Sequence, residues 1–232
     1  MRRYLIVDDN AAFAENLAEI IVDTGAEASV AHSGELALAL AQTTRYDALV
    51  SDMRMPVMGG AELVHRVRAI DPGLPAIVVT AYIADNELET ARREGLLAIF
   101  GKPVPVDRLV ALLGRARRDA VVAIIEDDAA LADNLTEALR TRGFSAVTAS
   151  SLADTERLGV RPFCAIVDLR LPDGPDGAAM HRLATRYPQL PMLVITALET
   201  PPPAPTAGVF SKPFDTAALL DAVERLYASG RG

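Results

Sequence analysis

The feature that most constrains the fold is an internal repeat. Residues 5–17, LIVDDNAAFAENL, match residues 123–135, AIIEDDAALADNL, almost position for position. Later segments also pair, such as 76–81 with 192–197 and 100–103 with 210–213. A period this long indicates duplicated domains rather than a solenoid of short repeats, and 232 residues suit two domains of ordinary size. We therefore predict one domain over residues 1–118 and a second over 119–232.

Within each copy, short apolar runs with β-branched residues alternate with stretches of helical period. In the first copy we predict strands at residues 4–7, 28–31, 47–51, 75–79 and 97–100, and helices at residues 11–23, 34–43, 60–69, 85–94 and 105–117. Five βα units predict an α/β fold with a doubly wound, five-stranded parallel sheet, which binds ligands beyond the carboxyl ends of its strands. Only a few residues separate Leu113 from Val121, so the linker between the copies should be short.

The second copy should follow the same plan with one exception, in the region of its fourth helix. The segment between Thr196 and Lys212 is shorter than the one between Thr80 and Lys102. It also contains prolines within residues 201–205, which cannot lie in a helix interior. We expect the fourth helix of this copy to be shortened or missing, with the proline-rich segment in its place.

Polar residues stand at the predicted carboxyl ends of four strands in the first copy, and should meet in one pocket. They are Asp8, Asp9, Asp52, Thr80 and Lys102. Carboxylates on adjacent strands suit a hard cation such as Mg²⁺, which prefers oxygen ligands. A carboxylate is also a competent nucleophile for phosphoryl transfer, provided that nearby cations neutralise the charge of the phosphate. Lys102 can supply such a cation, and the Thr80 hydroxyl can donate to a phosphoryl oxygen.

The two lysines support this interpretation. The chain contains 21 arginines but only two lysines, Lys102 and Lys212, and each precedes a proline at the predicted end of a fifth strand. In a chain so biased toward arginine, these positions indicate a need for a compact ammonium group rather than a planar guanidinium.

At this point the chain resembles the response-regulator receiver family of two-component signalling, whose domains have the flavodoxin-like fold. The resemblance rests on the acidic pair, on Asp52-Met53-Arg54-Met55-Pro56 with Gly59-Gly60, on Thr80-Ala81 and on Lys102-Pro103, and it covers nearly the whole chain twice. It implies that Asp52 accepts a phosphoryl group from a histidine kinase or phosphotransfer protein. It further implies Mg²⁺ as cofactor, held by Asp8, Asp9, Asp52 and the backbone carbonyl of Arg54, with Thr80 and Lys102 on the phosphoryl group.

The resemblance carries over to the second copy residue by residue. The matching phosphoacceptor is Asp168, the matching phosphoryl contacts are Thr196 and Lys212, and the matching metal ligands are Glu126, Asp127, Asp168 and Arg170. Both copies depart from the family at the aromatic switch position, which is Ile99 in one and Val209 in the other. Phe100 and Phe210, one residue later, are candidates for a related role.

Composition narrows the function. The net charge is −8 and both halves are acidic, so we expect no nucleic-acid partner, since such proteins need a cationic face. The apolar runs are too short to cross a bilayer and no signal peptide is recognisable, so we expect no membrane insertion and a cytoplasmic location. The single cysteine, Cys164, lies in an apolar run typical of a buried thiol.

These observations favour a phosphorelay response regulator that is not an enzyme beyond its own phosphorylation and dephosphorylation. We expect output by protein contact or homodimerisation, without a DNA-binding domain. A phosphate sink or pseudo-receiver scaffold is an alternative for the same fold. Another is a phosphotransferase or phosphatase with an aspartyl nucleophile, although Arg54 and Arg170 stand two residues after the aspartates, where an acid would be expected. The chain as an excised part of a larger hybrid kinase is a further reading.

Overall fold

We analysed a computed structural model of the chain, which describes residues 1–81, 94–197 and 202–230. The chain forms two compact units, Met1–Asp119 and Ala120–Gly232, divided one residue beyond the predicted boundary. Each unit is described by itself. The predicted helix at residues 85–94 lies almost wholly outside the described residues.

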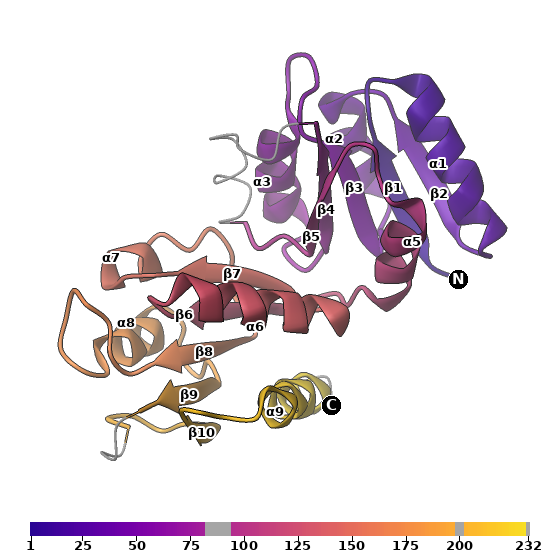
Figure 1. The fold of residues 1–232 in the computed structure, drawn as a ribbon. Coiled ribbons are helices and arrows are strands. Elements are labelled where there is room, and N and C mark those ends of the chain that lie inside the picture. Colours follow the sequence, from indigo (N-terminus) through magenta and orange to yellow (C-terminus); the bar gives the residue numbers. More distant parts are fainter. Residues whose placement is uncertain (82–93, 198–201, 231–232) are drawn as a thin grey trace. The chain divides into compact units, whose positions relative to one another are not determined.

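The first unit is a five-stranded parallel sheet with helices on both faces (Figure 1). Its strands run in the order β2-β1-β3-β4-β5. They are β1 (Arg3–Val7), β2 (Glu27–Ala31), β3 (Ala48–Asp52), β4 (Ala76–Thr80) and β5 (Ala98–Gly101). The helices are α1 (Ala11–Asp23), α2 (Gly34–Thr43), α3 (Gly60–Ile70) and α5 (Val106–Arg115). This is the predicted doubly wound fold, in which the strand order reverses beside β1.

The sheet is covered on both faces, which explains why its central strands carry runs of apolar residues rather than an alternating pattern. Every residue of β3 and β4 is buried. On one face, α1 and α5 pack side chains such as Leu17 and Leu109 against the sheet. On the other face, α2 and α3 contribute side chains such as Ala37 and Leu63.

Two local interactions position the starts of α1 and α3 next to the carboxyl end of the sheet. Asn10, directly after the acidic pair, caps α1 by accepting a hydrogen bond from the Phe13 amide at 3.1 Å. Gly60, at the start of α3, donates its amide to the Met53 carbonyl at 2.8 Å. A Cβ atom at Gly60 would lie 2.3 Å from the Asp52 carbonyl oxygen, so only glycine lets α3 begin this close to β3.

The second unit repeats the same topology. Its sheet has the order β10-β9-β8-β6-β7, which is the same order read from the other edge. The strands are β6 (Val121–Ile125), β7 (Ser145–Ala149), β8 (Cys164–Asp168), β9 (Met192–Thr196) and β10 (Gly208–Ser211). The helices are α6 (Ala129–Thr141), α7 (Leu152–Thr155), α8 (Ala178–Arg186) and α9 (Thr216–Ser229). The predicted fold class is therefore confirmed in both units.

The second unit departs from the first at two helices, whereas the sequence predicted a departure at one. The helix α7 has 4 residues where α2 has 10, so the expectation that this copy otherwise follows the first was wrong. The chain after α7 reaches Gly159 and Pro162, which oppose helix extension. Between β9 and β10 the described residues 202–207 contain no helix, in line with the predicted loss of the fourth helix. In that segment, Ala204 packs against the core cluster that contains Leu169 and Met180.

Candidate functional site

In the first unit, three of the five predicted polar residues at the strand ends, Asp8, Asp52 and Lys102, come together, with Lys102 in contact with both carboxylates. Asp52 ends β3 and Asp8 directly follows β1, and both residues are buried. The Lys102 ammonium lies 2.6 Å from Oδ1 of Asp52 and 3.0 Å from Oδ2 of Asp8. The Lys102 amide donates to the Thr80 carbonyl at 2.8 Å, which ties the lysine to the end of β4. Two carboxylates and one ammonium therefore meet at the carboxyl edge of the sheet.

The lysine is charged in this setting. Partial burial lowers the pKa of Lys102, but hydrogen bonds to Asp52 and Asp8 outweigh burial, so the net pKa lies above its ordinary value. The ammonium also lies 5.0 Å from the centroid of the Phe13 ring, a cation–π contact that no sequence motif indicated. The positive charge of Lys102 beside Asp52 offsets part of the repulsion between the Asp52 carboxylate and an incoming anion.

The second unit builds the same arrangement. The Lys212 ammonium lies 2.6 Å from Oδ2 of Asp168 and 2.8 Å from Oε2 of Glu126. Its amide donates to the Thr196 carbonyl at 2.8 Å, as in the first unit. As for Lys102, burial lowers the pKa of Lys212, but hydrogen bonds to Asp168 and Glu126 outweigh burial, so the net pKa lies above its ordinary value. Burial raises the pKa of the Glu126 carboxyl, although the hydrogen bond from Lys212 opposes this.

The loop after each phosphoacceptor candidate turns its backbone toward the carboxylate. The Arg54 amide donates to Oδ2 of Asp52 at 2.7 Å, and the Arg170 amide donates to Oδ1 of Asp168 at 2.9 Å. The sequence singled out these arginines for their carbonyl groups, and their amide contacts are an addition from the structure. Each amide holds the carboxylate in one orientation without adding a charge.

The two units differ in how their acidic residues gather. In the second unit, carboxylate oxygens of Glu126, Asp127 and Asp168 all lie within 4.8 Å of one another. Across residues 1–81, 94–197 and 202–230, no other three metal-ligating side chains come this close, so Asp8, Asp9 and Asp52 are more spread. Three clustered carboxylates supply the hard oxygen ligands that Mg²⁺ takes, so the donor set of the second unit fits that ion.

The other predicted site residues differ in their burial. Thr80 and Thr196 are buried at the ends of β4 and β9. Asp9 and Asp127 are exposed beside their buried neighbours. At the switch position, Ile99 packs against the core, whereas Val209 is 49% exposed. Phe100 and Phe210 pack against the core clusters on the α5 and α9 faces, and their predicted role stays a prediction.

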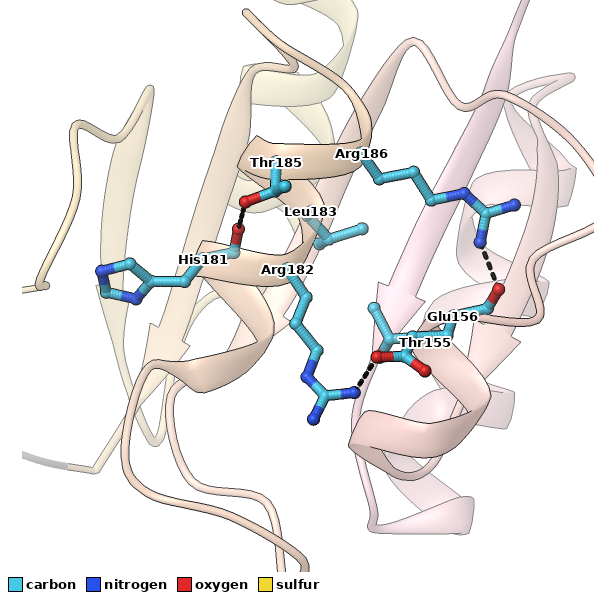
Figure 2. Close-up of a pocket in the computed structure, with 7 residues that line it drawn as sticks. All are labelled: Thr155, Glu156, His181, Arg182, Leu183, Thr185 and Arg186. Atoms are coloured by element: carbon cyan, nitrogen blue, oxygen red, sulfur yellow. Dashed lines mark hydrogen bonds and ion pairs between the residues drawn. The ribbon is translucent and has the colours of Figure 1, made fainter.

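A separate pocket in the second unit lies between α7 and α8 (Figure 2). It has a volume of about 490 Å³, and Arg182 and Arg186 reach across it toward Glu156. Arg182 bonds the Glu156 carboxylate, and Arg186 bonds the carbonyls of Glu156 and Leu158. The hydrogen bonds from Arg186 thus satisfy backbone carbonyls at and just after the carboxyl end of the short α7. Neither Asp168 nor Lys212 lines this pocket.

None of the helices within the described ranges combines the length and apolar character needed to cross a bilayer.

Comparisons with known proteins agree with this geometry. The family model described as "Response regulator receiver domain" matches residues 4–114. A response regulator receiver protein of Anaeromyxobacter sp. (strain Fw109-5) is 63% identical over 228 residues, covering 98% of this chain and 96% of that protein. An uncharacterized 14.6 kDa protein of Leptolyngbya boryana is 38% identical over 111 residues, covering 47% of this chain and 85% of that protein.

Among solved structures, the chemotaxis protein CheY4 of Vibrio cholerae is 31% identical, with a TM-score of 0.47, and covers 50% of this chain and 98% of that protein. The identity to the Anaeromyxobacter protein extends through both units. With two parallel sheets that each place a lysine between buried carboxylates at the strand ends, this chain belongs to the response regulator receiver family.

Proposed function

We propose that the chain accepts phosphoryl groups on Asp52 and Asp168 in a phosphorelay. The observation that carries the proposal is the contact, in both units, between a lysine ammonium and the buried carboxylate that ends the third strand of the sheet, at 2.6 Å. A buried carboxylate with a fixed cation beside it is a nucleophile whose approach to a phosphate is electrostatically favourable.

The donor is a phosphohistidine of a histidine kinase or phosphotransfer protein. A carboxylate oxygen of Asp52 forms the new bond to phosphorus, the bond from phosphorus to the histidine nitrogen breaks, and the electron pair returns to the imidazole, which takes a proton from solvent. Lys102 stabilises the charge on the phosphoryl oxygens, and the Arg54 amide holds the carboxylate in place. The products are an acyl phosphate on Asp52 and a free histidine.

Mg²⁺ fits the sites as the accompanying cation, and when bound it offsets the negative charge of the phosphoryl group. In the second unit Glu126, Asp127, Asp168 and the Arg170 carbonyl would hold it, and in the first unit Asp8, Asp9, Asp52 and the Arg54 carbonyl. The closer gathering of carboxylates in the second unit favours tighter binding there.

The test is the intact mass of the full chain after incubation with Mg²⁺ and a small-molecule phosphodonor. The wild type should take up two phosphoryl groups, and Asp52→Asn and Asp168→Asn should each lose one. Asp133→Asn, which changes an exposed aspartate of α6, serves as the matched control and should still take up two. Chelation of Mg²⁺ should abolish both additions.

Other outcomes are equally informative. A single addition that is lost only in Asp52→Asn would make the second unit an interaction domain. No addition to the folded wild type would refute the phosphoacceptor role with this donor and favour a scaffold. Continued release of inorganic phosphate from an external phosphoester, with no covalent addition at rest, would support an enzyme instead.

A further inference from the structure

The segment after α5 is hydrogen-bonded to the rest of the first unit as far as Asp119, the last residue of that unit. After α5 ends at Arg115, Nη2 of Arg118 lies 2.5 and 2.6 Å from the two carboxylate oxygens of Asp71. Arg118 also donates to the Tyr46 carbonyl, and the Asp119 amide donates to the Gly73 carbonyl at 2.8 Å. Since β6 begins at Val121, little of the connection is left unbonded. We call Asp71, Gly73, Arg118 and Asp119 the linker clamp.

The loop that receives the linker is shaped for it. A Cβ atom at Gly73 would lie 1.8 Å from the Asp119 carboxylate and 3.2 Å from the Asp119 amide nitrogen, so a side chain at this position would push the linker away. Asp119 itself has φ +55°, an uncommon backbone conformation for a residue other than glycine. The side chain of Arg118 is only 12% exposed. A charge pair this sheltered from water is screened less than a surface pair.

The same loop is also held from inside the unit. Arg68 on α3 is buried and donates to the carbonyls of Pro72 at 2.6 Å and Gly95 at 2.9 Å. Burial lowers the pKa of Arg68 to about 10, partly offset by Glu94 and Asp71. The guanidinium therefore stays charged at neutral pH. Arg68 and Arg118 therefore both bind the loop after α3, Arg68 through the Pro72 carbonyl and Arg118 through the Asp71 carboxylate.

The second unit has no counterpart of these residues. The positions that correspond to Arg68, Asp71 and Gly73 are Ala184, Tyr187 and Gln189. Gln189 adopts φ +68°, so its backbone takes a different course from that of Gly73, whose φ is not positive. The linker clamp is therefore specific to the first unit rather than a general requirement of this fold.

One helix spans the distance between Asp52 and the linker clamp. The first residue of α3, Gly60, touches the backbone of β3, since its amide bonds Met53 and its Cβ position is blocked by the Asp52 carbonyl. The residue after the helix, Asp71, binds Arg118 and donates its amide to Val67 at 2.7 Å. A helix transmits a displacement along its axis, and close packing at both ends converts small shifts into a change of contacts.

We propose that α3 and the linker clamp form the output path of the first unit, in which phosphorylation of Asp52 shifts α3 and loosens the hold of Asp71 on Arg118. Both carboxylate oxygens of Asp71 already lie 2.5 and 2.6 Å from Nη2 of Arg118, so a displacement of Asp71 with the end of α3 lengthens these contacts and weakens the clamp. The proposal rests on the proposed function of Asp52. The signal that leaves the unit is thus a change in how firmly residues 116–119 are held.

Hydrogen exchange of the full chain, followed by mass spectrometry, tests this proposal through the peptide that contains residues 116–121. Arg118→Ala should raise exchange there by roughly fivefold or more without any phosphodonor, because the Asp119 amide loses its protected setting. Arg108→Ala, an exposed arginine on α5, is the matched control and should leave the peptide unchanged. After phosphorylation, the wild type should approach Arg118→Ala, whereas Asp52→Asn should not change.

A second variant tests the path without any phosphoryl group. Gly60→Ala places a methyl group against the Asp52 carbonyl and should displace the start of α3, so exchange at residues 116–121 should rise while peptides of the second-unit core stay protected.

Intact mass on the same samples separates this proposal from the proposed function. Phosphoryl uptake with unchanged exchange at residues 116–121 overturns the output path. Absence of uptake refutes the function of Asp52 with this donor. The output path is then tested by Gly60→Ala alone: raised exchange at residues 116–121 supports it, and unchanged exchange refutes it. Equal exchange in Arg118→Ala and wild type would refute the linker clamp itself.

Discussion

The two units share a sheet and a charged site but differ in their helices. In both, a lysine lies between the carboxylate that directly follows the first strand of the unit and the carboxylate that ends its third strand. Yet α2 has 10 residues and α7 has 4, and residues 202–207 form no helix before β10. Because the site residues stand on strand ends and on the loops directly after them, the helical layer can change without moving them. The site and the outer surface are therefore separable parts of this fold.

The comparison also reverses a simple expectation about the acidic cluster. The second unit, with its short α7 and no helix in residues 202–207, is the one whose three carboxylates gather within 4.8 Å. Glu126 takes the place of Asp8 there, and its longer side chain still reaches the lysine at 2.8 Å. Loss of helix content is thus no sign of a degraded site.

The sharpest test of whether the sites are equivalent is removal of each lysine. Lys102→Met and Lys212→Met should each slow phosphoryl uptake in their own unit by about 100-fold or more, since a fixed charge next to the transferred group is lost. The rate in the other unit of the same variant is the internal control. Time-resolved intact mass measures both. An effect in one unit alone would break the equivalence of the two sites.

The next largest effect concerns Arg68, a buried charged residue of the first unit whose matching position in the second unit is Ala184. Arg68→Ala should lower the free energy of unfolding of the first unit by about 2–3 kcal/mol, because the carbonyls of Pro72 and Gly95 lose a buried charged donor. Circular dichroism during denaturation with urea reports on both units. Labelling of Cys164, which is buried and whose thiol pKa is raised by burial, reports on the second unit alone. A matching shift in the Cys164 signal would contradict an effect confined to the first unit.

The acidic residues of the two units should differ in their affinity for Mg²⁺. Asp127→Asn removes one of three gathered carboxylates and should weaken Mg²⁺ binding to the second unit by about tenfold, or about 1.4 kcal/mol. Asp9→Asn, the matched change in the first unit, should have a smaller effect because its neighbours are more spread. Calorimetric titration of each variant provides the comparison. Equal losses would mean that the tighter cluster brings no advantage in binding.

The smallest predicted effect concerns one loop position in the two units. Asp173 accepts hydrogen bonds from the amide of Leu152 at 2.9 Å and of Ala153 at 3.4 Å, and thus caps α7. Asp173→Ala should lower the stability of the second unit by about 1 kcal/mol. Val57 occupies the matching position and is 93% exposed, so Val57→Ala should change stability by less than about 0.5 kcal/mol. A larger loss from Val57→Ala would show that this loop supports the first unit as well.

The sequence predicted what depends on local pattern. The apolar runs located all five strands of the first unit to within one residue, and Asp52 and Lys102 meet because parallel strands end at one edge of the sheet. The shortness of α7 was not predicted, because the internal repeat indicates a full helix at this position, whereas Gly159 and Pro162 shortly after it oppose one. Contacts such as Phe13 with Lys102 and Gly73 with Asp119 join residues far apart in the chain, so no local pattern indicates them. The roles of the site residues stay predictions.

The scarcity of lysine has a consequence for amine chemistry. Besides the exposed N-terminus, the chain carries primary amines only at Lys102 and Lys212, and each is ion-paired to two carboxylates that raise its pKa. A protonated, ion-paired amine is a poor nucleophile toward acylating reagents. Such a reagent should therefore modify the N-terminus first and reach a lysine only when its ammonium group is no longer paired with an anion. In this protein, the rate of acylation at two positions becomes a direct measure of whether each lysine is held in its ion pairs.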